Sequence, residues 1–429
     1  MPTKVNLITL GCSKNLVDSE HLAGLLGEDF KIYFDSDKRR FDIVIINTCG
    51  FIGDAKEESI DMILQYAEAK KQGKIKTLIV FGCLIQRYTE ELSKEIPEVD
   101  AFFGANDYKE IAEYLMNKTL ERNETLRLLS TPKHYAYLKI SEGCDKFCSF
   151  CAIPYIRGRH TSLPIEDLVE QAKSLANQGV KELIVVAQDT TNYGVDLYGK
   201  CRLTDLLKEF AKIDAIEWIR LQYSYPNNFP MDLLDLMQGE PKICKYIDMP
   251  LQHIDNSILD SMNRHITKEQ ITSLIEHLRT KVPQLCLRTT LIVGYPNETE
   301  EQFAALKDFV AQTKFDRMGA FTYSPEEGTA AFKLEDNVPE EVKSERLNEL
   351  IEIQQSVSLS LNNQKIGKVF KVLIDRLEGD FWVGRTEFDS PEVDNEVLIP
   401  ANQKAKIGTF VNALITSAEE FDLYADIVS

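Results

Sequence analysis

The chain has 429 residues and a formal net charge of −19, from 49 basic and 68 acidic side chains. This length predicts two to three domains, and no apolar run approaches the roughly 20 residues of a membrane span. The acidic balance disfavours non-specific binding to polyanions and favours a basic protein partner. Nine cysteines without disulfide spacing indicate a reducing, cytoplasmic location with metal-bound or buried thiols.

The first 125 residues alternate between strand and helix patterns. Short β-branched runs at residues 5–10, 43–47 and 77–81 predict strands, and the stretch 55–71 is compatible with a helix. Strands that alternate with helices are typical of a parallel sheet. We therefore predict an N-terminal α/β domain.

A cysteine follows each of these three strands: Cys12, Cys49 and Cys83. Because the carboxyl ends of parallel strands share one edge of the sheet, we expect the three thiols to converge there. A single cysteine at a strand end is more often a small buried residue. Three at equivalent positions favour a metal cluster that keeps one iron open to a ligand from outside.

A polar, charged linker at residues 117–133 leads to a second domain, residues 130–364. Helices are predicted at 165–178 and 300–313, between strands at 137–140, 183–187, 218–221, 246–249, 285–292 and 318–323. About six βα units make a partial version of the eight-fold barrel, whose site lies at the carboxyl-terminal mouth. Such a barrel is open on one side, which suits a large substrate such as a segment of a macromolecule.

Three further cysteines form a C-x-x-x-C-x-x-C loop after the first of these strands: Cys144, Cys148 and Cys151. Three thiolates leave one iron of a [4Fe-4S] cube open, whereas protein electron carriers usually supply four. The loop resembles that of the radical S-adenosylmethionine (SAM) superfamily, in which SAM binds the open iron. The alternative is a structural zinc site, with His134 or His160 as fourth ligand. Structural zinc sites usually pair C-x-x-C elements, so the cluster is favoured.

Several residues at the predicted mouth are candidates for binding a cofactor. Gln188 and Asp189 directly follow the second strand of the barrel. The resemblance to radical SAM enzymes implies that Phe150, Ile292 and Gly294 lie near the adenine of SAM. Asp189 is also a candidate for catalysis or substrate binding.

Four arginines lie near strand ends or in the loop after the cysteines: Arg157, Arg159, Arg220 and Arg288. A guanidinium can hold a carboxylate through two parallel hydrogen bonds. Any one of these arginines is more often a structural ion pair, but together they are the candidates for binding a substrate carboxylate.

His253 could act as a base, although a hydrogen-bonded histidine at a strand end is the favoured interpretation. The remaining cysteines, Cys201, Cys244 and Cys286, show no ligand spacing. We interpret them as inert.

Residues 339–364 predict a polar helical connector, and residues 365–429 predict a small antiparallel β-barrel. Its strands are expected at 369–374, 381–385, 396–399 and 410–415. This segment has seven basic and twelve acidic residues, a net charge of −5, whereas a nucleic-acid-binding module leans basic. We expect it to bind a basic protein and not transfer RNA.

The three-domain layout resembles the methylthiotransferase family over essentially the whole chain, with a terminal barrel similar to the TRAM domain. One branch of this family modifies an adenosine in transfer RNA, and the other modifies an aspartate in a small-subunit ribosomal protein. Residues 11–20, 187–191 and 388–394 resemble the ribosomal-protein branch. Ser13 and Ser390 stand where the family often has Pro and Ala, and neither is a predicted ligand.

The resemblance implies methylthiolation of the β-carbon of an aspartate in the ribosomal protein numbered twelve of the small subunit. It also implies two [4Fe-4S] clusters, one on each set of three cysteines, two molecules of SAM, and a reduced flavodoxin or ferredoxin as electron donor. An unactivated C–H bond has no acidic proton, so its cleavage requires a carbon radical. The alternatives are a transfer-RNA adenosine methylthiotransferase and, more distantly, a non-catalytic iron–sulfur or zinc protein.

Overall fold

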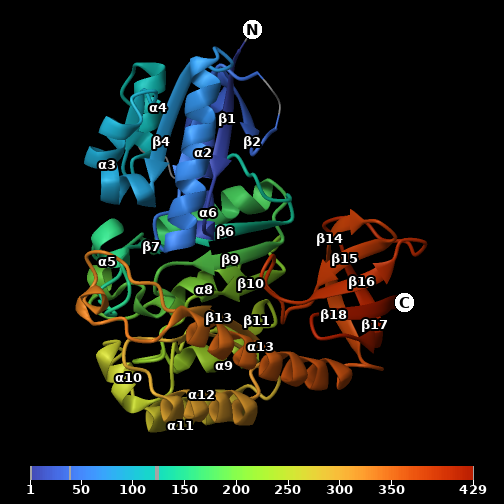
Figure 1. The fold of residues 1–429 in the computed structure, drawn as a ribbon. Helices are drawn as coiled ribbons and strands as arrows, with labels where there is room; N and C mark the ends of the chain where they lie inside the picture. The colour runs from blue at the N-terminus through green and yellow to red at the C-terminus, as the bar shows by residue number, and fades with distance from the viewer. Residues whose placement is uncertain (1, 38–39, 121–124, 429) are drawn as a thin grey trace.

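The computed structural model describes residues 2–37, 40–120 and 125–428. Figure 1 shows an α/β unit at the N-terminus, a larger central unit below it, and a small barrel at the C-terminus. Each unit has its own main sheet. The predicted fold class, a parallel α/β domain followed by an open barrel and a small terminal β-barrel, is confirmed.

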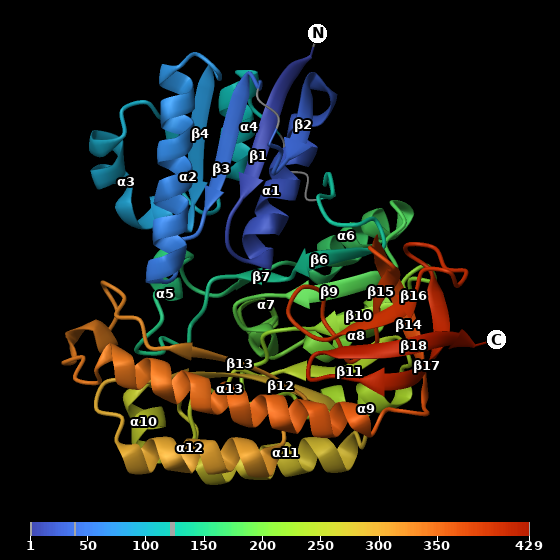
Figure 2. The ribbon, with the colours of Figure 1, turned by 45° about the vertical axis from the view of Figure 1, so that its right-hand side comes forward.

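The N-terminal sheet has five parallel strands in the order β2-β1-β3-β4-β5. Helices α2 and α3 pack on one face and helices α1 and α4 on the other, giving a three-layer unit (Figure 2). Strand β3 is buried along its whole length, as expected for a central strand covered on both faces. The elements are β1 (Thr3–Thr9), α1 (Ser13–Leu26), β2 (Phe30–Phe34), β3 (Ile43–Thr48), α2 (Gly53–Lys71), β4 (Thr77–Gly82), α3 (Cys83–Glu95), β5 (Ala101–Phe103) and α4 (Tyr108–Met116).

The central unit contains six parallel strands in the order β13-β12-β11-β10-β9-β6. The two edge strands of this sheet, β6 and β13, do not pair with each other, so the predicted partial barrel is open. Its elements are β6 (Tyr135–Lys139), β7 (Ser141–Glu142), α5 (Ile153–Ile156), β8 (Thr161–Ser162), α6 (Ile165–Asn177), β9 (Glu182–Val186), α7 (Val195–Tyr198), α8 (Leu203–Ala211), β10 (Trp218–Leu221), α9 (Asp232–Gly239), β11 (Ile243–Asp248), α10 (Asn256–Ser261), α11 (Lys268–Lys281), β12 (Cys286–Val293), α12 (Glu300–Thr313), β13 (Arg317–Thr322) and α13 (Glu340–Asn363).

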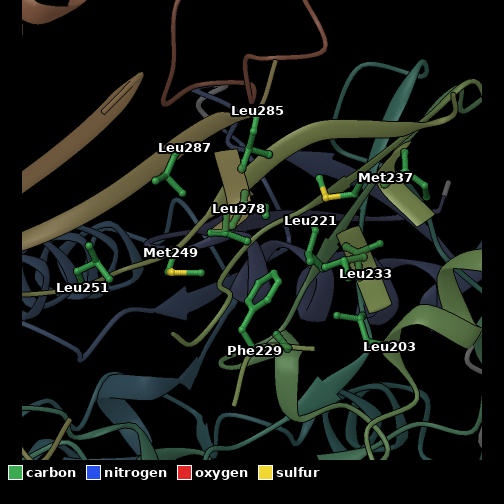
Figure 3. Close-up of a cluster of buried hydrophobic side chains, with 14 of the residues drawn as sticks. Leu203, Leu221, Phe229, Leu233, Met237, Met249, Leu251, Leu278, Leu285 and Leu287 are labelled. Atoms are coloured by element: carbon green, nitrogen blue, oxygen red, sulfur yellow. The ribbon is translucent and has the colours of Figure 1, made fainter. Parts of the chain in front are cut away.

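Successive residues of these strands face opposite sides of the sheet. In β10, Ile219 and Leu221 belong to the large apolar core beneath the helices, part of which is shown in Figure 3. Trp218 faces the other way and packs with side chains of the C-terminal barrel. The inner face of the open barrel is therefore partly covered by the C-terminal unit.

Helix α13 connects the central unit to the barrel and lies against α12 and β13. Neither α13 nor any other helix in the described part of the chain is long and apolar enough to cross a membrane.

The C-terminal unit is a closed barrel of five strands, one more than the sequence predicts. The additional strand, β18, pairs antiparallel with β17 and parallel with β16. The strands are β14 (Val369–Glu378), β15 (Phe381–Arg385), β16 (Glu396–Pro400), β17 (Phe410–Ala418) and β18 (Asp422–Val428).

The segment 386–395, between β15 and β16, docks the barrel onto the central unit through buried charges. Arg317 Nε lies 3.1 Å from Asp389 Oδ1, and Asp394 accepts a hydrogen bond of 2.7 Å from the hydroxyl of Tyr246. Both carboxylate side chains have no exposed surface. The net charge of the segment suggests that these acids belong to a surface for a basic partner. They instead bind residues of the central unit inside the molecule.

Candidate active site

The three N-terminal cysteines lie at the carboxyl edge of neighbouring strands. Cys12 caps the amino end of α1 after β1, Cys49 follows β3 directly, and Cys83 begins α3 after β4. Because β1, β3 and β4 are adjacent in the sheet, the structure brings the three thiols to one place. The hydroxyl of Ser59 fixes the backbone of Cys49, accepting from its N–H at 3.0 Å and donating to its carbonyl at 2.9 Å.

Two glycines allow the strand ends to approach so closely. A Cβ on Gly11 would lie 2.7 Å from Cys49 Cβ, and one on Gly82 would lie 2.5 Å from the carbonyl oxygen of Thr48. Both glycines have positive φ, of +89° and +107°, which other residues rarely adopt. The sequence therefore needs glycine on either side of this site.

Positive charge and backbone N–H groups act on the thiols of this set. Burial alone would raise the pKa of Cys12, but Lys14, Arg157 and the N–H groups at the start of α1 lower it below its ordinary value. Burial raises the pKa of Cys49 to about 11 and also raises that of Cys83. A metal binds cysteine as the thiolate, so its binding here would release the protons of these thiols.

Arg157 and Asn15 contact the thiol of Cys83. Arg157 Nε lies 3.4 Å from Cys83 Sγ, and Asn15 Oδ1 lies 3.7 Å from the same sulfur. Arg157 Nη2 also donates to Asn15 at 2.6 Å. Arg157 follows the second cysteine loop, so one residue of the central unit contacts the N-terminal cysteine site.

The second set, Cys144, Cys148 and Cys151, lies in the loop between β7 and α5. The N–H of Cys144 donates to Gly158 at 3.1 Å, and that of Cys151 donates to the carbonyl of Cys148 at 3.0 Å. Gly143 has φ of +75°, and a Cβ there would lie 2.1 Å from the carbonyl oxygen of Arg159. The loop is thus folded tightly on itself.

Arg264 donates from Nη1 to Cys148 Sγ at 3.3 Å, and Tyr225 OH lies 3.9 Å from the same sulfur. Burial raises the pKa of Cys144 to about 11 and also raises that of Cys151. Buried thiols beside a cation suit ligation, because the cation offsets the charge of the thiolates. Sequence reasoning missed Arg264, which carries no motif of its own.

The histidines that a zinc site would use are engaged elsewhere. His134 Nε2 lies 2.8 Å from Asp375 of the barrel, and His160 Nε2 lies 3.1 Å from Ser162 Oγ. Across residues 2–37, 40–120 and 125–428, no group of three or more His, Cys, Asp and Glu side chains is arranged to hold a single metal ion. A cube of four irons is larger than one ion, and the donors here are thiols, which iron–sulfur clusters use.

Buried acceptor atoms without a partner lie at the mouth of the barrel. Gln188 Oε1, Ser224 Oγ and Gln252 Oε1 are buried and make no hydrogen bond. They follow the ends of β9, β10 and β11. A buried polar atom without a partner costs about 1–3 kcal/mol. The mouth therefore fits a polar ligand with several donor groups, as SAM has.

Phe150 and Ile292 each pack against an apolar cluster formed by Ile258, Met262, Tyr295, Tyr323 and Ala331. Gly294 adopts φ of +70°, and a Cβ there would lie 2.3 Å from Lys343 Cγ. Asp189 accepts from the N–H of Thr191 at 3.0 Å and lies 3.3 Å from Lys146. Ile292 therefore shares a cluster with Phe150 of the cysteine loop, and Asp189 contacts that loop through Lys146, whereas Gly294 lies against Lys343 of α13.

His253 is fully buried and accepts a hydrogen bond of 3.0 Å on Nδ1 from the N–H of Asp255. Burial lowers its pKa to about 4. Its other ring nitrogen lies 3.8 Å from Glu298. The hydrogen bond to Nδ1 agrees with the favoured interpretation, a hydrogen-bonded histidine at a strand end.

Two of the four candidate arginines belong to the interface with the C-terminal barrel. Arg220 is completely buried, with Nε 2.8 Å from Glu182 and Nη1 2.7 Å from the carbonyl of Glu387. Arg288 lies between Asp248 and Asp394. Both guanidinium groups are already paired, so neither is available to a substrate.

The other two arginines line a cleft of about 480 Å³ between the N-terminal and central units. Arg157 is buried and paired with Asp18 and Glu142 at 2.9 and 3.0 Å. Arg159 is largely exposed and lies 3.3 Å from Asp145. Of the four, only Arg159 combines exposure with a position beside the cysteine loops.

An open parallel barrel with a three-cysteine loop after its first strand defines the class of radical SAM enzymes. Residues 138–310 match the family model described as the radical SAM superfamily, and residues 4–104 match one described as uncharacterized protein family UPF0004. Residues 366–428 match the TRAM domain. A solved radical SAM methyltransferase, TsrM from Kitasatospora setae, covers 89% of this chain and 77% of its own with a TM-score of 0.56. At 13% identity it supports the fold alone.

Curated relatives identify the family within this superfamily. Proteins named ribosomal protein uS12 methylthiotransferase RimO from Flavobacterium johnsoniae, Phocaeicola vulgatus and Bacteroides thetaiotaomicron are 54%, 53% and 52% identical. Each alignment covers 99% of this chain and 98–99% of the relative. The chain belongs to the RimO family and is a radical SAM methylthiotransferase.

Proposed function

We propose that this enzyme adds a methylthio group to the β-carbon of an aspartate in ribosomal protein uS12, using two molecules of SAM and two [4Fe-4S] clusters. The names of the relatives contain ribosomal protein uS12 as the protein that is modified. The structural observation that supports two clusters most directly is the contact of Arg157 with Cys83. Arg157, which follows the short helix after one cysteine set, contacts a thiol of the other set.

Each cysteine set would hold one cluster and leave one iron open. When bound, the cluster on Cys144, Cys148 and Cys151 would supply the electron that cleaves SAM to a hydrogen-abstracting radical, while the other would hold the sulfur to be transferred. The chain's own contribution is to keep the two sites together at one interface. Arg157 and Asp18 are almost completely buried at that interface, and Glu142 beside them is 19% exposed.

The residues at the mouth would bind SAM. Gln188 donates to Glu142 at 2.7 Å, which leaves its buried Oε1 free to accept from the cofactor. Phe150, Ile292 and Gly294 would border the adenine. Asp189, held by Thr191 and Lys146, would face the same ligand.

Arg159 is our candidate to hold the carboxylate of the target aspartate. It lies in the cleft between the units, and its side chain is 71% exposed. When a bound substrate segment excludes water from the cleft, an unpaired carboxylate there would cost several kcal/mol. A guanidinium partner would offset this cost and direct the β-carbon toward the radical.

The C-terminal barrel would contact the basic ribosomal protein through exposed acids. Asp389 and Asp394 are buried, so this surface is smaller than the net charge of the segment suggests. Glu378, Asp380 and Glu392 remain exposed. We propose no direct binding of transfer RNA, and a reduced flavodoxin or ferredoxin as electron donor.

The test is anaerobic incubation of the reconstituted enzyme with SAM, a reductant and either uS12 or transfer RNA, followed by mass spectrometry of both. We expect a mass gain of one methylthio group, with loss of one hydrogen, on an aspartate of uS12. Modification of an adenosine with uS12 untouched would transfer the proposal to the other branch. Absence of iron, or zinc in its place, would contradict both.

A further inference from the structure

Each cysteine set has one thiol that accepts a hydrogen bond from a buried arginine. Arg157 Nε lies 3.4 Å from Cys83 Sγ, and Arg264 Nη1 lies 3.3 Å from Cys148 Sγ. Both arginines are about 95% buried, with 5% and 4% of their surface exposed. Removing a guanidinium from water is costly, so a buried arginine that is turned toward sulfur is an unusual partner for a plain cysteine.

The two arginines differ in how their charge is balanced. Arg157 Nη1 pairs with Asp18 at 2.9 Å and with Glu142 at 3.0 Å, and Nη2 donates to Asn15 at 2.6 Å. These contacts fix the guanidinium so that Nε faces Cys83. Two carboxylates offset part of its charge, and Arg157 acts on the sulfur through both that charge and a directed N–H group.

Arg264 has no carboxylate partner among the residues that the structure describes. Its Nη2 donates to the carbonyl of Pro250, and its guanidinium lies 4.3 Å from the ring centre of Tyr225. The full positive charge therefore remains beside Cys148. The same kind of residue thus gives a balanced environment at one site and a cationic one at the other.

Hydrogen bonds and charges near the sulfurs tune the reduction potential of an iron–sulfur cluster. Reduction adds negative charge, which a nearby N–H donor or cation stabilises. We propose that Arg157 and Arg264 are positioning residues that raise the reduction potentials of the two clusters separately, Arg157 at the N-terminal cysteines and Arg264 at the loop cysteines. This rests on the proposed function, because it requires both clusters.

The geometry also makes the N-terminal site depend on the contact between units. Arg157 belongs to the central unit, as does Glu142. Cys83 belongs to the N-terminal unit, together with Asn15 and Asp18, two of the three residues that orient Arg157. A cluster on the N-terminal cysteines would therefore have the raised reduction potential only when the two units are docked. The potential of the loop cluster would not depend on that contact through Arg264.

The experiment uses two backgrounds that keep one cluster each, obtained by replacing either cysteine set with Ala. In each, the midpoint potential is measured by redox titration followed by electron paramagnetic resonance. With Arg157→Lys we expect at least a tenfold fall in the ratio of reduced to oxidised N-terminal cluster at a fixed potential. For one electron this is a shift of about 59 mV to more negative values. The loop cluster should not shift.

Arg264→Gln should give the converse result: the reduction potential of the loop cluster becomes more negative, and that of the N-terminal cluster does not change. Arg127→Lys is the matched control, because Arg127 is also buried between the units, pairs with Glu20 and has no hydrogen bond to a cysteine in the described part of the chain. It should leave both potentials unchanged. Unchanged potentials in the Arg157 and Arg264 variants, or equal shifts of both clusters in each, would overturn the inference.

A second measurement does not require either arginine to be replaced. With guanidinium-¹⁵N arginine incorporated, pulsed resonance of each single-cluster background should show a ¹⁵N coupling to the reduced cluster, and absence of that coupling also overturns the inference. If the unmodified enzyme fails to hold two clusters, the proposed function itself fails. The two failures are therefore distinguishable.

Discussion

Arg157 and Asp18 form an ion pair of 2.9 Å between the central and N-terminal units, and both side chains are almost completely buried. Lys139 and Glu142 complete the same group of charges. Breaking one partner of a buried ion pair leaves an uncompensated charge. The contact between the units is therefore specific, and it holds the two cysteine sets at one interface.

The first prediction concerns iron. The anaerobically reconstituted chain should bind about eight irons, as expected for two cubes. Replacing Cys144, Cys148 and Cys151 with Ala should halve the iron and abolish formation of 5′-deoxyadenosine.

Replacing Cys12, Cys49 and Cys83 with Ala should also halve the iron but leave SAM cleavage measurable, while methylthio transfer stops. Iron analysis and chromatography of the SAM products provide the measurements. Cys201 is the control, since its replacement should change neither. The assignment is wrong if both triple variants keep all their metal.

The second prediction uses Gly11. Gly11→Ala should reduce the iron of the N-terminal site, because the new Cβ would lie 2.7 Å from Cys49 Cβ and the backbone has φ of +89°. Gly73→Ala is a matched control, with φ of +67° and no atom within 4 Å of the added Cβ. Its cost should be conformational only, roughly 1–2 kcal/mol of stability. Equal iron content in the two variants would contradict this account of the site.

Local sequence patterns predict most of the fold. The bounds of β10 and α12 follow from a short aromatic and β-branched run and from an amphipathic stretch after Thr299, which caps the helix. Strand β18 was missed because its acidic residues hide the alternation and its partners are distant in sequence. Register between such strands depends on tertiary contacts that no local pattern carries.

The cysteines of the candidate site were predictable because their spacing and their positions after strands are typical of metal ligands. The arginines were not, because the role of a charged side chain depends on partners far along the chain. Arg220 pairs with Glu182, and Arg317 pairs with Asp389 of the barrel. Asn15 lies within a segment that the family resemblance singles out, whereas Arg264 is recognisable only in the fold.

The third prediction concerns acid. His253 is buried and its pKa is lowered from 6.5 to about 4 by burial. The folded state then binds fewer protons than the unfolded state between these pH values. The contribution of His253 to the free energy of unfolding is therefore fully present above about pH 6.5 and is lost as the pH falls toward 4. The shift corresponds to about 3 kcal/mol. The free energy of unfolding of His253→Gln, measured with denaturant at pH 5 and pH 8, should differ less between the two pH values than that of the unmodified chain. An identical difference in the two proteins would contradict the burial of a neutral ring.

The fourth prediction separates two arginines. Arg159→Gln should increase the ratio of uncoupled SAM cleavage to methylthiolated product, because the target carboxylate loses its partner, while stability changes little for so exposed a side chain. Arg220→Gln should lower the free energy of unfolding by about 3 kcal/mol, as expected for a broken buried ion pair. If Arg159→Gln keeps full coupling, this residue does not hold the substrate.

The last prediction tests the surface of the C-terminal barrel. Asp380 and Glu392 are exposed and form no ion pair in the described part of the chain, so the double variant Asp380→Lys and Glu392→Lys should fold normally. Complementary charge chiefly accelerates association. We therefore expect association with the basic ribosomal protein to slow about tenfold at low salt, with a smaller effect at high salt.

The matched control for this surface is Asp394→Asn, which changes the charge of the same segment at a buried position. Asp394 accepts hydrogen bonds from Tyr246 and from the N–H of Ser390, at 2.7 and 2.9 Å, and pairs with Arg288. Its substitution should destabilise docking of the barrel, seen as faster proteolysis between residues 364 and 369, and not act through long-range charge. If the double Lys variant instead gains binding to transfer RNA while its association with uS12 is unchanged, the exposed acids exclude nucleic acid and do not recruit the protein.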